Sequence, residues 1–261
     1  MGKNENRAYR YRWGAFILLL LTYFLVFFHR LSPAAVKGNL EEVFGLTAMQ
    51  YSNLSSAYFY TYVIMQIPSG ILADTLGARK TVTLGCAVMA IGSVIFGLAP
   101  NFSVLFIARM LVGFGASVIF LSILKIQSTW FEEKEFGMLT GLTTGVGGLG
   151  GAMAQGPLAA LVALLTWRMS FIAIGVISLI LAVILYIVVR NKPEDKGFAP
   201  IVVLPKSDAE KPKVFHTLGE IFKSPHIWPI FIMNFFIFGV NFTFTAWMIP
   251  FLTDVYGLSV T

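Results

Sequence analysis

Charged side chains are scarce in this sequence. Of its 261 residues only 12% are Asp, Glu, Lys or Arg, whereas 57% are hydrophobic; a soluble domain carries about 25% charged residues. Most of the chain is therefore expected to contact lipid rather than water. In a soluble protein the net charge of +6 would suggest a nucleic-acid partner. Here the cations fall between apolar runs, which favours a membrane protein with no nucleic-acid partner.

Cysteine and intramembrane carboxylates are also lacking. The single cysteine, Cys86, lies inside an apolar run and has no partner for an internal disulfide. No Asp or Glu occurs in the middle of a long apolar run, and His29 is far along the chain from His216 and His226. An intramembrane enzyme would need a nucleophile beside a base, or a metal cluster. The sequence therefore predicts no enzyme, no metal site and no cofactor.

Long apolar runs, in contrast, are abundant. A spanning helix needs about 20 mostly apolar residues, and we expect such spans at 13–37, 50–73, 80–99, 103–128, 137–162, 168–190 and 226–252. This predicts an all-α integral membrane protein with a six-helix bundle in 1–190, a linker in 191–225 and a seventh helix in 226–261. The linker stretch FHTLGEIF is expected to form a short amphipathic helix. Six helices, a linker and one more helix predict an incomplete second bundle, with further helices missing from this chain.

The placement of lysine and arginine predicts the orientation of the spans. The segment Met1–Arg12, the loop with Arg79 and Lys80, and the linker all carry cations, and alternating spans place them on one side. Connections rich in Lys and Arg stay in the cytoplasm. We therefore expect a multi-pass protein of the inner or plasma membrane with a cytoplasmic N-terminus and a cytoplasmic linker.

The connection between the second and third spans reads GILADTLGARK. It resembles the signature of the major facilitator superfamily, G-x-x-x-D-x-x-G-x-R-[RK], matched at Gly70, Asp74, Gly77, Arg79 and Lys80. The fourth span has RMLVGFGAS, similar to the family pattern R-x-x-x-G-x-G. The fifth has AMAQGPLAAL, which resembles the Gly-Pro motif with alanines replacing the usual next glycine pair. TWRMSF, RNKPEDKG and WMIPFL resemble stretches of organic-anion members.

The resemblance implies roles for several of these residues. The motif residues would form a gate that holds two bundles together on the cytoplasmic side. Its glycines allow close approach, and Asp74 could accept hydrogen bonds from a facing helix N-terminus. The alternative is a turn whose cations only anchor the chain at the headgroups. Structural or coupling roles would fall to Arg109, Gly113, Gly156 and Pro157.

The first span carries the strongest candidate for binding. Its apolar run Trp13–Phe28 leads into His29 and Arg30, and Pro33 follows shortly after. If the helix continues to Val36 or beyond, both side chains lie within the membrane, where a charge is costly and usually functional. The alternative is that the helix ends at Arg30, which then reaches the outer surface. Family members with an arginine in span one imply that Arg30 binds the anionic group of the substrate.

Other polar side chains complete the candidate set. In the second span, steps of four place Tyr58, Tyr62 and Gln66 on one helix face, although hydrogen bonding between helices would explain them equally well. Lys125 lies near the inner end of span four, where its ammonium could also reach the surface. The predicted substrate-binding residues are Arg30, His29, Tyr58, Tyr62, Gln66, Lys125, Asn234 and Asn241. His29 is the one titratable candidate near neutral pH.

The stretch GVGGLG at Gly145–Gly150 fits a dinucleotide-binding pattern, but no predicted strand precedes it. We interpret its glycines as contacts for helix packing. The predicted function is secondary transport of a small solute, an organic anion by preference, through alternating access. A coupling ion, the bilayer and a C-terminal half of the transporter are the expected partners. The alternative is a receptor or assembly protein built on half of a transporter.

Overall fold

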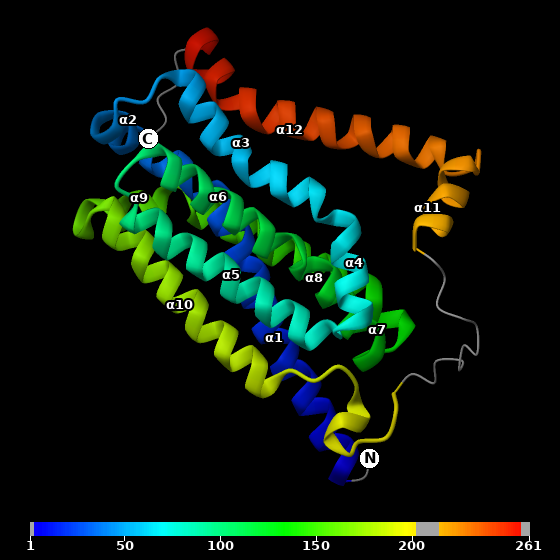
Figure 1. The fold of residues 1–261 in the computed structure, drawn as a ribbon. Helices are drawn as coiled ribbons and strands as arrows, with labels where there is room; N and C mark the ends of the chain where they lie inside the picture. Colours follow the sequence, from blue (N-terminus) through cyan, green and yellow to red (C-terminus); the bar gives the residue numbers. More distant parts are fainter. Residues whose placement is uncertain (1–2, 202–213, 257–261) are drawn as a thin grey trace. The chain divides into compact units, whose positions relative to one another are not determined.

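The structure is a computed structural model that describes residues 3–201 and 214–256. In residues 3–5, 214–218 and 241–254 only the backbone is described. The chain divides into two compact units, Met1–Val203 and Leu204–Thr261. All regular elements of the described ranges are helical, in agreement with the predicted all-α class (Figure 1).

Short breaks divide the long helical stretches of the first unit. Its helices in chain order are α1 (Lys3–Leu31), η1 (Ser32–Val36), α2 (Lys37–Phe44), α3 (Ala48–Ile64), α4 (Gln66–Thr75), α5 (Ala78–Leu98), α6 (Phe102–Ser117), α7 (Ile119–Trp130), α8 (Glu133–Met153), α9 (Gly156–Leu165), α10 (Trp167–Val188) and η2 (Pro193–Lys196). The second unit contains α11 (Val214–Lys223) and α12 (Trp228–Tyr256). The stretch FHTLGEIF, expected to form a short helix, lies within α11.

Local sequence explains several helix ends. Thr47 caps α3 because its side-chain oxygen accepts a hydrogen bond from the Gln50 backbone amide at 3.2 Å, and the Gln50 side-chain oxygen accepts one from the Thr47 backbone amide at 2.9 Å. The Asn101 side chain accepts from the Val104 amide at 3.1 Å and so caps α6. At Gly77 the chain turns between α4 and α5 with φ of +84°, a conformation that glycine adopts without strain.

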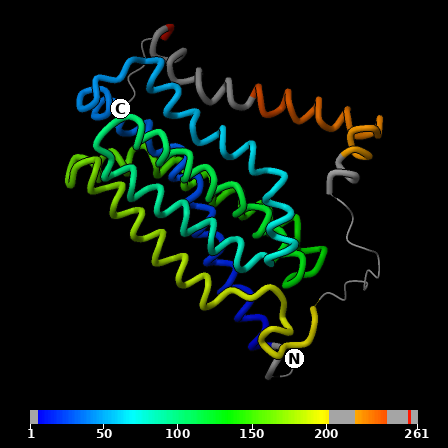
Figure 2. Tube along the Cα trace, in the orientation of Figure 1, coloured from blue at the N-terminus to red at the C-terminus, as the bar shows by residue number. Residues whose placement is uncertain are grey.

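The helices of the first unit pack in a defined set of pairs. The helix α5 packs against both α10 and α6, whereas α3 packs on α6 and α1 packs on α8. Figure 2 shows these paired segments running side by side along the bundle. In α8, a Cβ at Gly147, Gly150 or Gly151 would collide with side chains or backbone of α1. The GVGGLG stretch therefore serves helix packing, as predicted, although Gly141 and Gly145 face open space.

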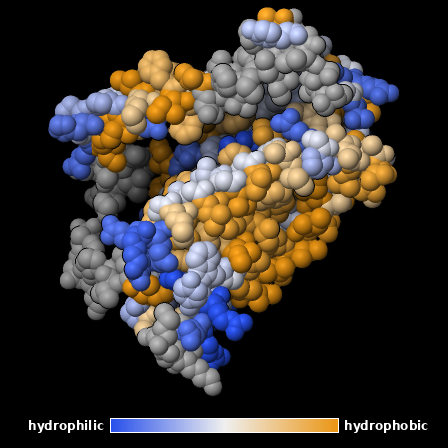
Figure 3. All heavy atoms as spheres, turned by 180° about the vertical axis from the view of Figure 1, so that it is seen from behind, coloured by the Kyte–Doolittle hydropathy of each residue, from blue (hydrophilic) through white to orange (hydrophobic). Residues whose placement is uncertain are grey.

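Apolar side chains cover the outside of the unit as well as its core. On α10, Ile177, Ile180, Val183 and Ile187 are each more than half exposed. Figure 3 shows how hydrophobic residues extend over one face of the molecule. An exposed apolar surface of this extent marks contact with another apolar phase, and in a chain of this composition that phase is lipid.

Length and composition single out fewer spans than the seven expected. Four stretches of the described chain qualify: Asn6–Phe44, Ala78–Leu98, Phe102–Trp130 and Trp167–Val188. A fifth is obtained if α8 and α9, which are bent by 43°, form one broken span. The predicted spans 50–73 and 226–252 lie in α3 with α4 and in α12, and they stay predictions. Gly156 and Pro157 begin α9 just after the bend, and no atom lies within 4 Å of a Cβ at Gly156.

Candidate functional site

Arg30 lies in the last turn of α1, just before the chain changes helix type. The helix α1 ends at Leu31, and the backbone continues as η1 and then as α2 to Phe44. The stretch that qualifies as a span, Asn6–Phe44, therefore contains Arg30 rather than ending at it. Arg30 therefore lies inside a longer helical stretch, which η1 and α2 continue beyond the end of α1.

Aromatic rings surround the Arg30 guanidinium. Its Cζ atom lies 4.6 Å from the ring centre of Phe27, 5.3 Å from Tyr58, 5.8 Å from Phe59 and 5.2 Å from Tyr62. Its Nε donates to the Tyr58 hydroxyl at 3.3 Å. Cations are attracted to aromatic faces at such distances. We call these five residues the aromatic site.

Among the described residues, the cation of the aromatic site is not paired with an anion. In the part of the chain that the structure describes, no carboxylate lies within 4.0 Å of the Arg30 guanidinium. The side chain is partly buried. A phenol and ring faces offset only part of the desolvation of a guanidinium, which in proteins is usually balanced by a carboxylate or phosphate.

A close helix contact fixes the position of Tyr58. The residue is fully buried in α3, and its ring stacks on Tyr62 with 5.6 Å between ring centres. A Cβ at Gly113 of α6 would overlap the Tyr58 carbonyl oxygen. The predicted structural role of Gly113 therefore has a physical basis, because α3 can approach α6 only where a side chain is missing.

Arg109 contacts the backbone at the same place. It is 2% exposed, and its Nη1 and Nη2 donate to the carbonyls of His29 at 2.7 Å and of Arg30 at 3.1 Å. Its Cζ also lies 5.3 Å from the centre of the Tyr58 ring. Arg109 and Gly113 are one helical turn apart on α6, so this helix contacts both the end of α1 and the middle of α3.

His29 and Gln66 are placed outside the aromatic site. The His29 ring is buried, and its Nε2 lies 3.1 Å from the Ser178 hydroxyl of α10. Gln66 is exposed, and its amide donates to the Tyr62 carbonyl at 3.4 Å. The helix is interrupted at Met65, between Tyr62 and Gln66, so the face of α3 does not continue regularly into α4.

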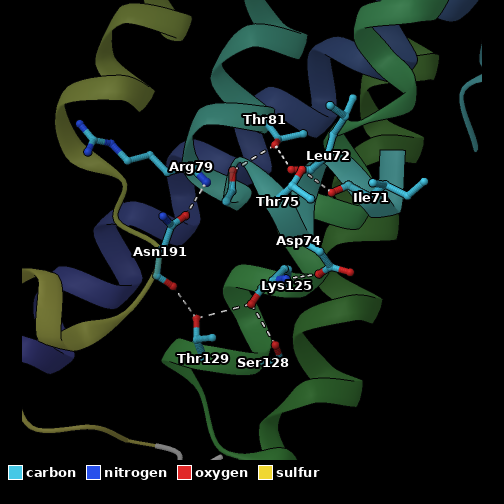
Figure 4. A network of polar contacts seen from close by, with 11 residues as sticks. Ile71, Leu72, Asp74, Thr75, Arg79, Thr81, Lys125, Ser128, Thr129 and Asn191 are labelled. Atoms are coloured by element: carbon cyan, nitrogen blue, oxygen red, sulfur yellow. Dashed lines mark hydrogen bonds and ion pairs between the residues drawn. The ribbon is translucent and has the colours of Figure 1, made fainter. Parts of the chain in front are cut away.

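Lys125 lies in another cluster, at the end of the unit that carries the GILADTLGARK motif. Its ammonium forms an ion pair with Asp74. Nearby, Asn191 accepts a hydrogen bond from the Arg79 amide at 2.8 Å through its side chain and one from the Thr129 hydroxyl at 2.8 Å through its carbonyl. Figure 4 shows these side chains, which we call the motif network: Asp74, Arg79, Lys125, Thr129 and Asn191.

The motif network ties α5, α7 and the end of α10 together. The Arg79 guanidinium donates to the Tyr186 carbonyl at 3.0 and 2.5 Å and lies 4.4 Å from that ring's centre. A Cβ at Gly77 would lie 2.7 Å from the Asn191 side chain. In contrast, Lys80 is exposed, and a Cβ at Gly70 would meet no atom within 4 Å. The contacts of this unit thus explain Gly77, Asp74 and Arg79 but require neither Gly70 nor Lys80.

The remaining predicted residues belong to the second unit. The Asn234 amide donates to the Ile230 carbonyl of its own helix at 2.8 Å. Asn241 also lies in α12, but its side chain is outside the described residues. Within residues 3–201 and 214–256, no three His, Cys, Asp or Glu side chains gather where a metal ion could bind.

Sequence reasoning missed three contributors. Phe27 and Phe59 belong to the aromatic site, but each is an aromatic residue in an apolar run and gives no signal of its own. Phe27 is three residues before Arg30, a spacing that places both on one helix face. Asn191 follows α10 in a polar stretch, where its contact with Gly77 could not be foreseen.

Comparison with known proteins gives a consistent family. A family model described as Major Facilitator Superfamily matches residues 15–261. The probable L-galactonate transporter of Escherichia coli K12 is 26% identical over 99% of this chain and 58% of its own length. The hexuronate transporter of Bacillus subtilis 168 is 30% identical over 82% and 50%, respectively. The probable sulfoacetate transporter of Cupriavidus necator is 29% identical over 62% and 38%.

Solved structures show the same fold. The crystal structure of a bacterial homolog of the human lysosomal transporter Spinster, inward-facing and unoccupied, superposes with a TM-score of 0.70 at 23% identity. The match covers 96% of this chain and 57% of the other. The chain also spans about half the length of the curated relatives it matches.

Proposed function

The chain belongs to the major facilitator superfamily, and we propose that it acts in secondary transport of a small organic anion, with Arg30 as the residue that binds the anionic group. Relatives named as transporters of galactonate, hexuronate and sulfoacetate support the substrate class. In the proposed alternating access, two bundles rock about a site near the middle of the membrane.

The observation that carries this proposal is that no carboxylate of the described residues pairs with the charge of Arg30. The two other cations singled out within the spans have built-in partners: Arg109 contacts backbone carbonyls and Lys125 contacts Asp74. Arg30 has ring faces and one phenol. A carboxylate or sulfonate on the substrate would supply its missing partner through a charge-assisted hydrogen bond that a planar guanidinium can make in bidentate form.

Tyr58 and Tyr62 would form a wall of the binding site. The Tyr58 hydroxyl holds Arg30 Nε, so the two Nη groups stay available for an anion. We propose that the residues in direct contact with the anionic group do not include His29, Gln66, Asn234 and Asn241. For Lys125 we now propose a role in the motif network, because its ion pair with Asp74 occupies its charge.

The motif network would act as the gate. We propose that its side faces the cytoplasm, together with the N-terminus and the linker, on the basis of the positive-inside rule. A second bundle would be needed to complete the path through the membrane. Orientation is tested with single cysteines at Lys3 and Lys206 in a Cys86→Ala background: labelling of both by an impermeant thiol reagent outside intact cells would reverse it.

The decisive experiment measures anion affinity of the complete gene product. Galactonate, sulfoacetate and galacturonate, which is a hexuronate, are titrated by calorimetry into wild type, Arg30→Lys and Arg30→Ala. We expect weaker binding with lysine, which keeps the charge but loses the planar fork, and no binding with alanine. Lys37→Ala is the matched control, because Lys37 is an exposed cation seven residues further along that is paired with Glu41. Unchanged affinity of Arg30→Ala would refute the proposal.

A further inference from the structure

Pro33 removes one backbone donor from the place where α1 ends. In an α-helix the carbonyl of residue i accepts from the amide of i+4, and in a 3₁₀-helix it accepts from i+3. Position 33 would therefore serve the carbonyl of His29 in the first pattern or that of Arg30 in the second. Proline has no N–H, so neither bond can form with Pro33.

The carbonyls of His29 and Arg30 are the two that Arg109 contacts. Its Nη1 lies 2.7 Å from the His29 oxygen and its Nη2 lies 3.1 Å from the Arg30 oxygen. The Ser32 hydroxyl adds a bond to the His29 oxygen at 3.1 Å. An unpaired carbonyl in a nonpolar environment is costly. Here the Arg109 side chain of α6 supplies the missing hydrogen bonds.

We infer that Arg109 is a positioning residue: its guanidinium takes the place of the amide that Pro33 lacks, and so holds the backbone that carries Arg30. The buried Arg109 contacts the carbonyl of Arg30 itself. Its Cζ and the Arg30 Cζ both lie 5.3 Å from the centre of the Tyr58 ring. Arg109 therefore holds the backbone of Arg30, and the Tyr58 hydroxyl holds its guanidinium. This inference rests on the proposed function, in which Arg30 binds the anion.

A second arginine of this unit provides a matched control. Arg168 of α10 donates through Nη1 to the carbonyls of Gly97 at 3.1 Å and of Ala99 at 2.6 Å, just before Pro100. It thus resembles Arg109 in its chemistry and in the proline that follows the carbonyls. However, its rings are Trp167 and Phe44, and it has no contact with the aromatic site.

The test is a double-mutant cycle between positions 109 and 33. Wild type, Arg109→Met, Pro33→Ala and the double variant are compared for galacturonate affinity and for the temperature of unfolding in detergent. We expect Arg109→Met to weaken galacturonate binding by about tenfold or more, as the loss of charged hydrogen bonds implies. In the Pro33→Ala background, where an amide is restored, the same change should cost about threefold less. Arg168→Met should lower the unfolding temperature without changing affinity.

Each possible failure has a distinct meaning. If Arg109→Met weakened galacturonate binding equally in the wild-type and Pro33→Ala backgrounds, Arg109 would not be replacing the missing amide. If Arg109→Met lowered the unfolding temperature but left galacturonate affinity unchanged, Arg109 would not position Arg30. If Arg109→Met does not fold, Arg109→Lys replaces it, and rescue of that variant by Pro33→Ala is expected. Unchanged affinity of Arg30→Ala would refute the proposed function alone, because the cycle in unfolding temperature still tests the contact between Arg109 and the end of α1.

Discussion

The motif network and the aromatic site belong to one unit but provide for their cations in opposite ways. In the motif network, Lys125 pairs with the Asp74 carboxylate and Arg79 donates twice to the Tyr186 carbonyl. In the aromatic site, Arg30 has one phenol and four ring faces. The cations of the motif network hold helices together, whereas no carboxylate of the described residues pairs with Arg30, which is the basis of its proposed role in binding an anion.

The largest expected effect comes from giving Arg30 the partner that it lacks. Tyr62→Glu would place a carboxylate beside the guanidinium and so make the aromatic site resemble the motif network. The built-in charge should compete with the anion and weaken its binding by about a hundredfold, or about 3 kcal/mol. Calorimetric titration with galacturonate measures the change.

Tyr62→Gln is the matched control for this substitution. It removes the same ring and introduces a side chain of the same length without charge. We expect it to weaken binding only through loss of the aromatic wall. If Tyr62→Glu and Tyr62→Gln bound galacturonate equally, the charge of Arg30 would not be the feature that recognises the anion.

Much of this contrast was accessible from the sequence. The apolar runs predicted the helices, and the motif predicted where a turn with a charged network would lie. Spacing on one helix brought Tyr58 and Tyr62 together, and the break at Ser32 and Pro33 pointed to Arg30. The helices, the turn at Gly77 and the contact of Tyr58 with Tyr62 could be predicted because helical periodicity and turn preferences are properties of neighbouring residues.

Inferences that needed a second helix were less reliable. The ion pair of Lys125 with Asp74 of α4 was not foreseen, because the spacing within α7 contains no information about α4. His29 precedes Arg30 in sequence, yet it packs on Ser178 of α10 because successive helical residues point about 100° apart. Gln66 follows the face of Tyr62 by its spacing, but the break at Met65 intervenes.

The ion pair between α1 and α8 should give the largest effect on stability. Arg12 donates to both oxygens of Glu135 at 3.1 and 3.2 Å, and the two side chains are 9% and 19% exposed. Glu135→Gln keeps the acceptor for the Glu132 amide but removes the charge. Because a largely buried guanidinium would lose its carboxylate, we expect a loss of about 2 kcal/mol in the free energy of unfolding, measured by denaturant titration in micelles.

Galacturonate affinity should be the same in Glu135→Gln as in wild type, because this pair is remote from the aromatic site. The double variant Arg12→Met with Glu135→Leu should recover most of the stability, since two apolar side chains leave no unpaired charge. A double variant as unstable as Glu135→Gln would show that the pair contributes more than charge compensation.

A smaller effect on stability is expected at the gate itself. The side chains of Lys125 and Asp74 are 39% and 71% exposed, and such pairs contribute about 0.5 kcal/mol or less. Asp74→Asn should therefore fold normally and yet change the transport rate and the access of thiol reagents from the motif side. Lys125→Gln should reproduce both changes, and the double variant should add nothing. Wild-type rate and access in Asp74→Asn would leave the motif only as a membrane anchor.

The smallest effect concerns an ion pair outside the spans. Lys134 donates to Glu132 at 2.6 Å, and this hydrogen bond, with the lysine charge, holds the pKa of the Glu132 carboxyl below its ordinary value. A lowered pKa stabilises the folded state above the usual range of glutamate, and that contribution is lost as the pH falls through the folded-state value. Lys134→Ala should raise the Glu132 pKa, followed by the carboxyl-carbon NMR shift, whereas Lys134→Arg should not. Because the side chains of Lys134 and Glu132 are 78% and 51% exposed, we expect no measurable change in the denaturation midpoint. A drop as large as that of Glu135→Gln would show that burial does not decide which of these pairs matter.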